Sequence, residues 1–159
     1  MSDAPLSEEQ IRATLAAYLG LLQRHVSAEV MMSKILTDDF ETGFVGGHMW
    51  KGLDGLRDFL SQREGFFDER HEVKEVLEVA PRSDDEVEVK TRLEFFLRRW
   101  EPPSPTSDEF TGWAFHTWIL RRSAGQPESR VAAQLVDGFD HLNDNAKRLF
   151  STPEEGLKR

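Results

Sequence analysis

His116 is the one titratable residue in the middle of an apolar stretch, residues 110–122, that reads FTGWAFHTWILRR. A neutral imidazole accepts or donates a proton near pH 7, so a histidine that faces a cavity is a candidate general acid or base. A buried histidine can instead be a core residue whose ring is hydrogen-bonded to the backbone or to a carboxylate. Where the imidazole points therefore decides whether this position carries chemistry.

Asp137 is a second candidate, on the last strand that the sequence predicts, residues 130–139. Alternate residues of a strand share a face, so Asp137 is expected on the same face as the apolar Leu135 and Phe139. A carboxylate on an apolar face is costly unless it is paired. Asp137 therefore either orients and charges His116, or is a solvated residue at the end of the strand.

Large flat side chains suit a cavity that holds a ring system. The candidates for lining such a pocket are Phe44, Trp50, Phe59, Trp113, Trp118 and Leu135. Aromatic residues at strand spacing are equally typical of an ordinary core. The partner that we expect is a small apolar or aromatic ligand.

Several other chemistries are excluded by composition and motif. The chain has no cysteine, which rules out disulfides, thiolate nucleophiles and thiolate metal ligands. Its five histidines show no metal-ligand spacing, and it has neither a glycine-rich nucleotide loop nor a GxSxG serine motif. We therefore expect no metal and no cofactor.

The charge and hydropathy of the chain limit the partners and the location that we expect for it. A formal net charge of −9 argues against nucleic acid and against an anionic membrane surface as partners. No apolar run reaches the ~20 residues of a membrane span, and the first residues lack the features of a signal peptide. These observations predict a cytoplasmic protein.

Periodicity predicts the elements that position these residues. Ser7 and Gln10 have the spacing of a capping box, and apolar residues then recur at three- and four-residue steps, as in a long amphipathic helix. Residues 86–100 alternate like a strand with one buried face, whereas residues 110–122 are apolar on both faces and predict a central strand. The remaining elements are helices at 28–36 and 52–63, strands at 40–45, 48–51, 69–80 and 130–139, and a closing helix at 143–150. This order predicts an α+β domain with a strongly curved antiparallel sheet.

Four segments give the chain a resemblance to a known superfamily. They are the first helix with Tyr18, the run Leu36-Thr37-Asp38-Asp39-Phe40, the turn Trp50-Lys51-Gly52-Leu53-Asp54-Gly55-Leu56 and the strand spacing from Glu86 to Phe139. The layout of residues 9–150 resembles the nuclear-transport-factor-2-like superfamily, which includes SnoaL-like polyketide cyclases, ketosteroid isomerases, limonene-epoxide hydrolases and scytalone dehydratases. The resemblance implies a cone-shaped α+β fold, in which a strongly curved antiparallel sheet wraps around three helices and encloses a cavity. The length of 159 residues predicts one domain, residues 1–159, which the resemblance makes a SnoaL-like domain, and we expect flexible tails at 1–6 and 152–159.

The resemblance also implies roles for individual residues. His116 matches the place where several of these enzymes have a catalytic polar group, and Asp137 lies near an acidic residue of the SnoaL-like cyclases and epoxide hydrolases. Tyr18 lies where ketosteroid isomerases carry a hydroxyl that hydrogen-bonds the substrate. Those isomerases need a carboxylate base where this chain has Phe44, or at best Glu41 a turn earlier, so steroid isomerisation is not implied.

Two functions are compatible with these observations. The first is a cofactor-free acid-base enzyme on an apolar cyclic substrate, a cyclase, dehydratase, isomerase or epoxide hydrolase, with His116, Asp137 and Tyr18 as catalytic residues. The alternative is a non-catalytic module of the same fold that binds a ligand or dimerises, because a fold alone does not decide function. Hydrogen bonding between His116 and Asp137 in an open cavity would favour the enzyme.

Apolar residues on the polar face of the strand at 86–100 predict self-association. Phe96 and Trp100 interrupt that face and, with Trp113 or Trp118, could form a patch. We expect a homodimer that buries this convex face of the sheet.

Overall fold

The computed structural model describes residues 6–122 and 128–150. The tails predicted at 1–6 and 152–159 lie outside this range except for Leu6, as does most of the turn after the central strand. The helices are α1 (Glu8–Gln23), α2 (Ala28–Lys34), α3 (Gly52–Gln62) and α4 (Asp144–Leu149). The strands are β1 (Leu36–Phe44), β2 (Met49–Lys51), β3 (Phe66–Pro81), β4 (Glu86–Arg99), β5 (Asp108–Arg122) and β6 (Ser129–Asp140).

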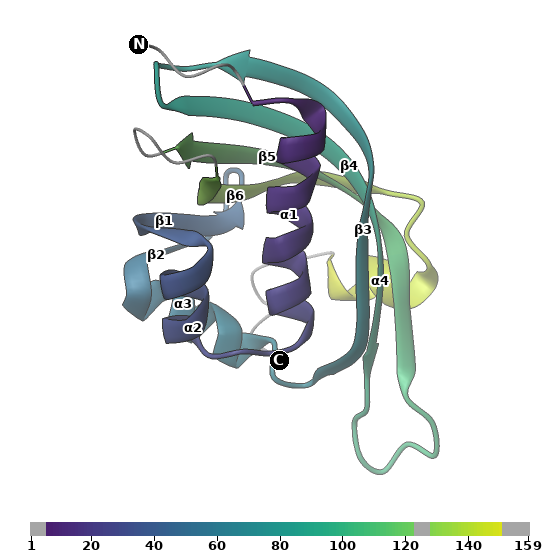
Figure 1. Cartoon of the computed structure of the whole chain (residues 1–159). Helices are drawn as coiled ribbons and strands as arrows, with labels where there is room; N and C mark the ends of the chain where they lie inside the picture. Colours follow the sequence, from purple (N-terminus) through teal and green to yellow (C-terminus); the bar gives the residue numbers. More distant parts are fainter. Residues whose placement is uncertain (1–5, 123–127, 151–159) are drawn as a thin grey trace.

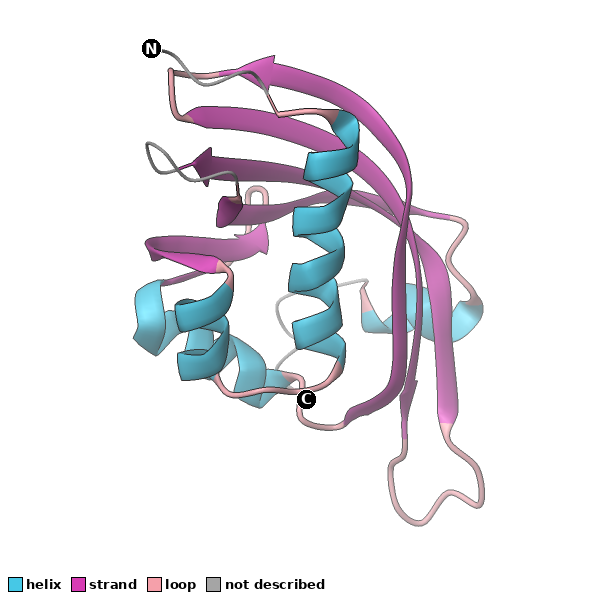
Figure 2. Cartoon of the chain, viewed as in Figure 1, coloured by secondary structure: helices cyan, strands magenta, loops and turns pink. Residues whose placement is uncertain are grey.

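The six strands form one curved sheet in the order β2-β1-β6-β5-β4-β3. Figure 1 and Figure 2 show the sheet bending around α1, with α2 and α3 near the β1–β2 edge. The α+β class and the curved sheet agree with the sequence-based expectation, and β5 lies inside the sheet between β4 and β6. One detail differs: β1 pairs parallel with β6, while the other neighbours are antiparallel, so the sheet is mixed.

The long β4–β5 hairpin gives the concave face its regular alternation. On β4 the residues facing α1 include Val89, Leu93 and Leu97, each buried, whereas their neighbours in sequence are partly exposed. The register pairs Leu93 with Ala114 and Thr91 with His116. His116 therefore faces the concave side of the sheet, because paired residues of neighbouring strands share a face.

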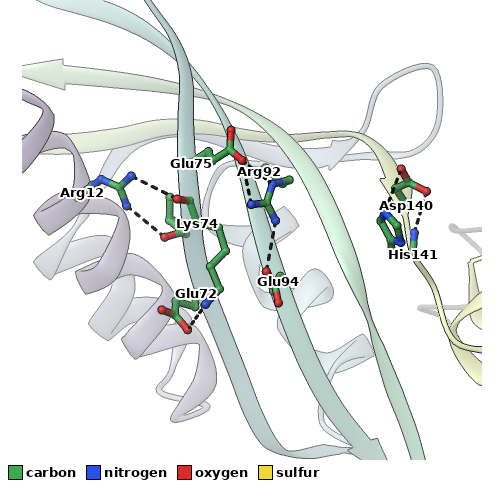
Figure 3. A network of polar contacts seen from close by, with 9 residues as sticks. Arg12, Glu72, Lys74, Glu75, Arg92, Glu94, Asp140 and His141 are labelled. Atoms are coloured by element: carbon green, nitrogen blue, oxygen red, sulfur yellow. Dashed lines mark hydrogen bonds and ion pairs between the residues drawn. The ribbon is translucent and has the colours of Figure 1, made fainter.

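Helix α1 fills the concavity, and two sets of contacts hold its N-terminal part in place. Its capping box is present, with the Ser7 hydroxyl accepting from the Gln10 backbone and the Gln10 side chain accepting from the Ser7 backbone. Arg12 reaches across to β3 and donates to the carbonyl oxygens of Val73 at 3.2 Å and Lys74 at 3.5 Å. Figure 3 shows Arg12 beside Lys74, with charged side chains along β3 and β4. Among the described residues, no helix is long and apolar enough to cross a membrane.

Two bulges in β6 change which of its side chains face the concavity. Ile119 and Leu120 of β5 pair with Ala133 and Val131 of β6, so Ala132 has no partner in β5. Phe115 and His116 pair with Gly138 and Val136, so Asp137 has none either. An extra residue shifts the alternation by one position. Gln134 and Val136 consequently face the concave side. Asp137 lies on the convex face with Leu135, as alternation predicts, whereas Phe139, beyond the second bulge, faces the concave side.

Candidate functional site

A cavity lies between the concave face of the sheet and helices α1 and α3. About 90 Å³ of it is open to the centres of water molecules, which is room for several waters. Its lining is mainly apolar and aromatic, and includes Phe44 and Phe59 of the predicted pocket residues. The polar side chains in the lining are Thr42, Arg63, His71, His116 and Gln134.

His116 projects into this cavity from β5 and is 5% exposed. Burial lowers the pKa of His116 from 6.5 to about 3, because a charged imidazolium is poorly stabilised away from water. The ring is therefore neutral at pH 7. Its Nδ1 atom lies 3.5 Å from the Nε2 atom of Gln134.

Gln134 fixes the tautomer of His116. The Gln134 Oε1 atom accepts a hydrogen bond from the Tyr18 hydroxyl at 2.5 Å and one from the Thr42 hydroxyl at 3.4 Å. Because these contacts occupy the amide oxygen, the amide nitrogen is the group that faces His116, and it donates to Nδ1. The ring proton of His116 then lies on Nε2. This residue offers an N–H donor to a molecule in the cavity.

His71, from β3, is held in the opposite tautomer by Gln23 of α1. The Gln23 Oε1 atom accepts from the His71 backbone N–H at 2.5 Å and lies 3.3 Å from Nδ1 of the ring. A backbone N–H can only donate, so the atom beside Nδ1 is an acceptor and Nδ1 carries the proton. Nε2 of His71 keeps its lone pair. Burial, and then the positive charge of Arg63 and the proximity of His116, hold the pKa of His71 well below 6.5.

Arg63, at the end of α3, brings a positive charge to the cavity wall. Its Nη2 atom donates to Glu69 Oε2 at 2.5 Å, and the His25 ring contacts the other carboxylate oxygen. Glu69 points inward because β3 has a bulge there, where Asp68 and Glu69 both lie opposite Leu97. The Arg63 Nη1 atom is buried and has no hydrogen-bond partner among the residues that the structure describes.

Asp137 does not meet His116. It lies at the second bulge of β6 and accepts a hydrogen bond from the Thr117 hydroxyl at 2.6 Å. Thr117 also accepts from Lys90 at 3.1 Å, on the face of the sheet that points away from α1. The expected pairing of His116 with Asp137 is therefore not formed, because the extra residue Ala132 places Asp137 on the convex face, opposite His116.

Tyr18 and the predicted pocket residues other than Phe44 and Phe59 lie behind the cavity wall or outside it. Tyr18 and Trp118 are buried in the core, with their ring centroids 5.3 Å apart. Trp50 packs on Phe59 and donates to Asp58 at 2.9 Å. Two others lie on the convex side of the sheet: Trp113, against His141, and Leu135, in a small cluster with Ile119.

Sequence patterns alone missed four of the residues that shape this site: Gln23, Arg63, His71 and Gln134. Arg63 follows Leu56 and Phe59 at helical spacing, so periodicity could have placed it on the buried face of α3. The two glutamines left no such signal, since each acts across 18 or more residues of sequence. Among residues 6–122 and 128–150, no group of three or more His, Asp or Glu side chains could hold a metal ion.

Several solved structures are similar to this architecture. No family model and no curated protein matches the sequence. A ketosteroid isomerase-like protein from Erwinia carotovora atroseptica is 23% identical with a TM-score of 0.59, the match covering 83% of this chain and 97% of that one. A protein assigned as a scytalone dehydratase, from Novosphingobium aromaticivorans, is 13% identical with a TM-score of 0.68 over 86% of this chain and 85% of that one.

A third similar structure carries the fold name itself. It is an NTF2-like protein with a cystatin-like fold from Novosphingobium aromaticivorans, 19% identical with a TM-score of 0.58 over 88% of this chain and 86% of that one. Identities this low establish a shared fold and leave activity open. The cone of curved sheet around α1 is therefore a fold that this chain shares with solved structures, among them the NTF2-like protein.

Proposed function

We propose that this chain is a cofactor-free acid-base enzyme that removes a proton from carbon in a small, largely apolar ring compound. One observation carries the proposal: two neutral histidines line one cavity and present complementary groups. His71 presents a lone pair on Nε2, and His116 presents an N–H on Nε2. A base and a donor in one water-poor site are the minimum for proton transfer.

The proposed step begins when Nε2 of His71 takes a proton from a substrate carbon. The C–H bond breaks, an N–H bond forms, and the electron pair moves onto an acceptor atom of the substrate. His116 donates a hydrogen bond to that atom and so stabilises the developing negative charge. Return of the proton to another carbon gives isomerisation, loss of a leaving group gives elimination, and attack on a second carbon gives cyclisation.

The buried hydroxyl of Tyr18 acts through Gln134 in this scheme. Burial raises the pKa of Tyr18 above its ordinary value, so the hydroxyl keeps its proton and remains a donor to the amide oxygen. Tyr18 is thus a positioning residue for His116, in place of the direct substrate contact that the resemblance suggests. The similar structures named for ketosteroid isomerase and scytalone dehydratase support proton transfer as a chemistry of this fold.

Hydrogen exchange with solvent tests the proposal. The protein is incubated in D₂O with cyclic ketones such as 2-tetralone and cyclohexenone, and deuterium uptake at the carbon next to the carbonyl is followed by NMR. We expect His71→Gln to lower the exchange rate by about 100-fold or more, the usual contribution of a positioned base. His141→Gln, at an exposed ring, is the matched control. Equal rates for wild type and His71→Gln, or no exchange with any compound, would refute the assignment.

A binding module is the second candidate, and the neutral partner of His71 favours it. Gln23 cannot raise the basicity of the imidazole as a carboxylate would, and the pKa of His71 is well below 6.5. A weak base in a well-formed cavity suits a protein that holds a ligand unchanged. Saturable binding of ring compounds without deuterium uptake would establish this alternative.

We also propose that the chain forms a homodimer through the convex face of the sheet. Trp100, at the end of β4, is 54% exposed, which is unusual for so large an apolar side chain. Phe96 and Trp113 belong to the same face, each with a guanidinium over its ring, Arg98 at 5.2 Å and Arg92 at 4.2 Å. Trp118 takes no part in this proposal, because it is buried on the concave side.

A further inference from the structure

We propose that the molecule bound in the cavity carries one carboxylate, or another singly charged oxyanion, and that Arg63 Nη1 is its anchor. This inference rests on the proposed function for the reaction that follows, although the binding it describes occurs with or without that reaction. It names a class of ligand, an anionic ring compound, and a residue that selects it.

The geometry of Arg63 leaves one edge of its guanidinium for a ligand. Its side chain is 6% exposed, and Nη2 is already bonded to Glu69. The guanidinium lies 5.8 Å from the ring centroids of both Phe59 and Phe66, and these two rings also line the cavity. Nη1 is buried without a partner, which costs free energy that an acceptor in the cavity would recover.

The charges around the cavity favour an anion. Among residues 6–122 and 128–150, Arg63 is the one lining residue with a full charge at neutral pH, and no carboxylate of these residues belongs to the lining. Glu69 is turned away, with its two oxygens toward Arg63 Nη2 and the His25 ring. His116 adds a neutral donor on another wall. A carboxylate accepts charge-assisted hydrogen bonds, which are about twice as strong as neutral ones.

An anion on Arg63 would also change the base. The charged and titratable groups that face His71 are Arg63 from α3 and His116 from β5, and both lower its pKa. A bound carboxylate offsets the charge of Arg63, so the pKa of His71 rises toward its ordinary value. The substrate would thereby strengthen the base that acts on it.

Benzoate and benzamide form a matched pair of probes for this anchor. They have the same shape, and only benzoate is charged, so the ratio of their dissociation constants isolates the anion. We expect wild type to bind benzoate at least tenfold more tightly than benzamide by titration calorimetry at pH 7. We also expect saturating benzoate to raise the proton affinity of the His71 ring at least tenfold, measured by NMR titration. Benzamide should leave that affinity unchanged.

Variants identify the anchor as Arg63. Arg63→Met combined with Glu69→Met removes the ion pair as a unit, and should reduce the benzoate preference to about unity while benzamide still binds. Arg57→Gln removes an exposed arginine of the same helix and should leave the preference intact. Equal affinities of wild type for the two probes would overturn the inference, as would a preference retained by a folded double variant.

The wild-type comparison decides the matter even if the double variant does not fold. Failure of the proposed function has a different signature. A benzoate preference without any deuterium uptake would support Arg63 as the anchor and reject the enzyme activity. Deuterium uptake without a benzoate preference would support the enzyme activity and reject the anchor.

Discussion

The stability of the fold in acid tests the neutral state of His116. Because burial lowers the pKa of His116 from 6.5 to about 3, at pH 5 the ring binds a proton in the unfolded chain and not in the folded one. The unfolded state then binds more protons, so the free energy of unfolding falls with falling pH. The stabilisation is full above pH ~6.5 and is lost progressively as the pH approaches ~3.

The size of this loss at pH 5 follows from the same two values. That pH is about 1.5 units below the ordinary pKa, and each unit corresponds to about 1.4 kcal/mol, so this one ring costs the fold about 2 kcal/mol. The pKa of His71 is lowered as well, which adds a loss in the same direction. Replacement of His116 alone separates its share from that of every other group.

Urea-induced unfolding at pH 7 and pH 5 measures the effect. Between these pH values, wild type and His141→Gln should each lose about 2 kcal/mol more than His116→Gln, in which the buried titration is absent. The exposed ring of His141 makes that variant the control for loss of a histidine as such. An equal loss in all three proteins would refute the buried neutral imidazole, and with it the donor role assigned to His116.

Two further perturbations address the buried ion pair and the convex face. Arg63→Met alone leaves the Glu69 carboxylate buried and should lower the free energy of unfolding by about 3–5 kcal/mol, whereas the joint Arg63→Met/Glu69→Met replacement should recover most of that loss. Urea unfolding of the two variants side by side checks this, and an equal loss in both would contradict the pairing. Trp100→Glu should convert a dimer to a monomer in sedimentation equilibrium, because it places a charge in the proposed interface; an unchanged mass would remove that face from consideration.

The parts of the fold that sequence could predict are those with an uninterrupted period. On β4 every second residue packs on the core, so the strand and its faces follow directly from the spacing of Leu93, Phe95 and Leu97. The first helix follows equally from its capping box and its apolar stripe. The central position of β5 follows from its apolar character on both faces, since a strand with both faces covered has no polar side.

The candidate site depended on features that interrupt those periods. Each bulge in β6 and β3 inserts one residue, and such an insertion reverses the face of every residue beyond it. Alternation along each strand allows Asp137 beside His116 and gives no reason to single out Glu69, although a bulge in β6 turns Asp137 outward and a bulge in β3 turns Glu69 inward. The glutamine partners of the two histidines arise from contacts between different elements, which periodicity along one element cannot reveal.

The hydrogen-bond partners of His71 and His116 are amides, and this explains why Arg63 dominates the electrostatics of the cavity lining. A carboxylate in place of Gln23 or Gln134 would fix the same tautomers, but it would also raise the pKa of each ring and add negative charge to the lining. The amides orient the rings and leave both neutral. Among the described lining residues Arg63 is then the one full charge, and after burial it is the next cause of the lowered pKa of His71. In the proposed enzyme, an anionic substrate would offset the share of this lowering that Arg63 causes, and would so make His71 a stronger base than a neutral substrate does.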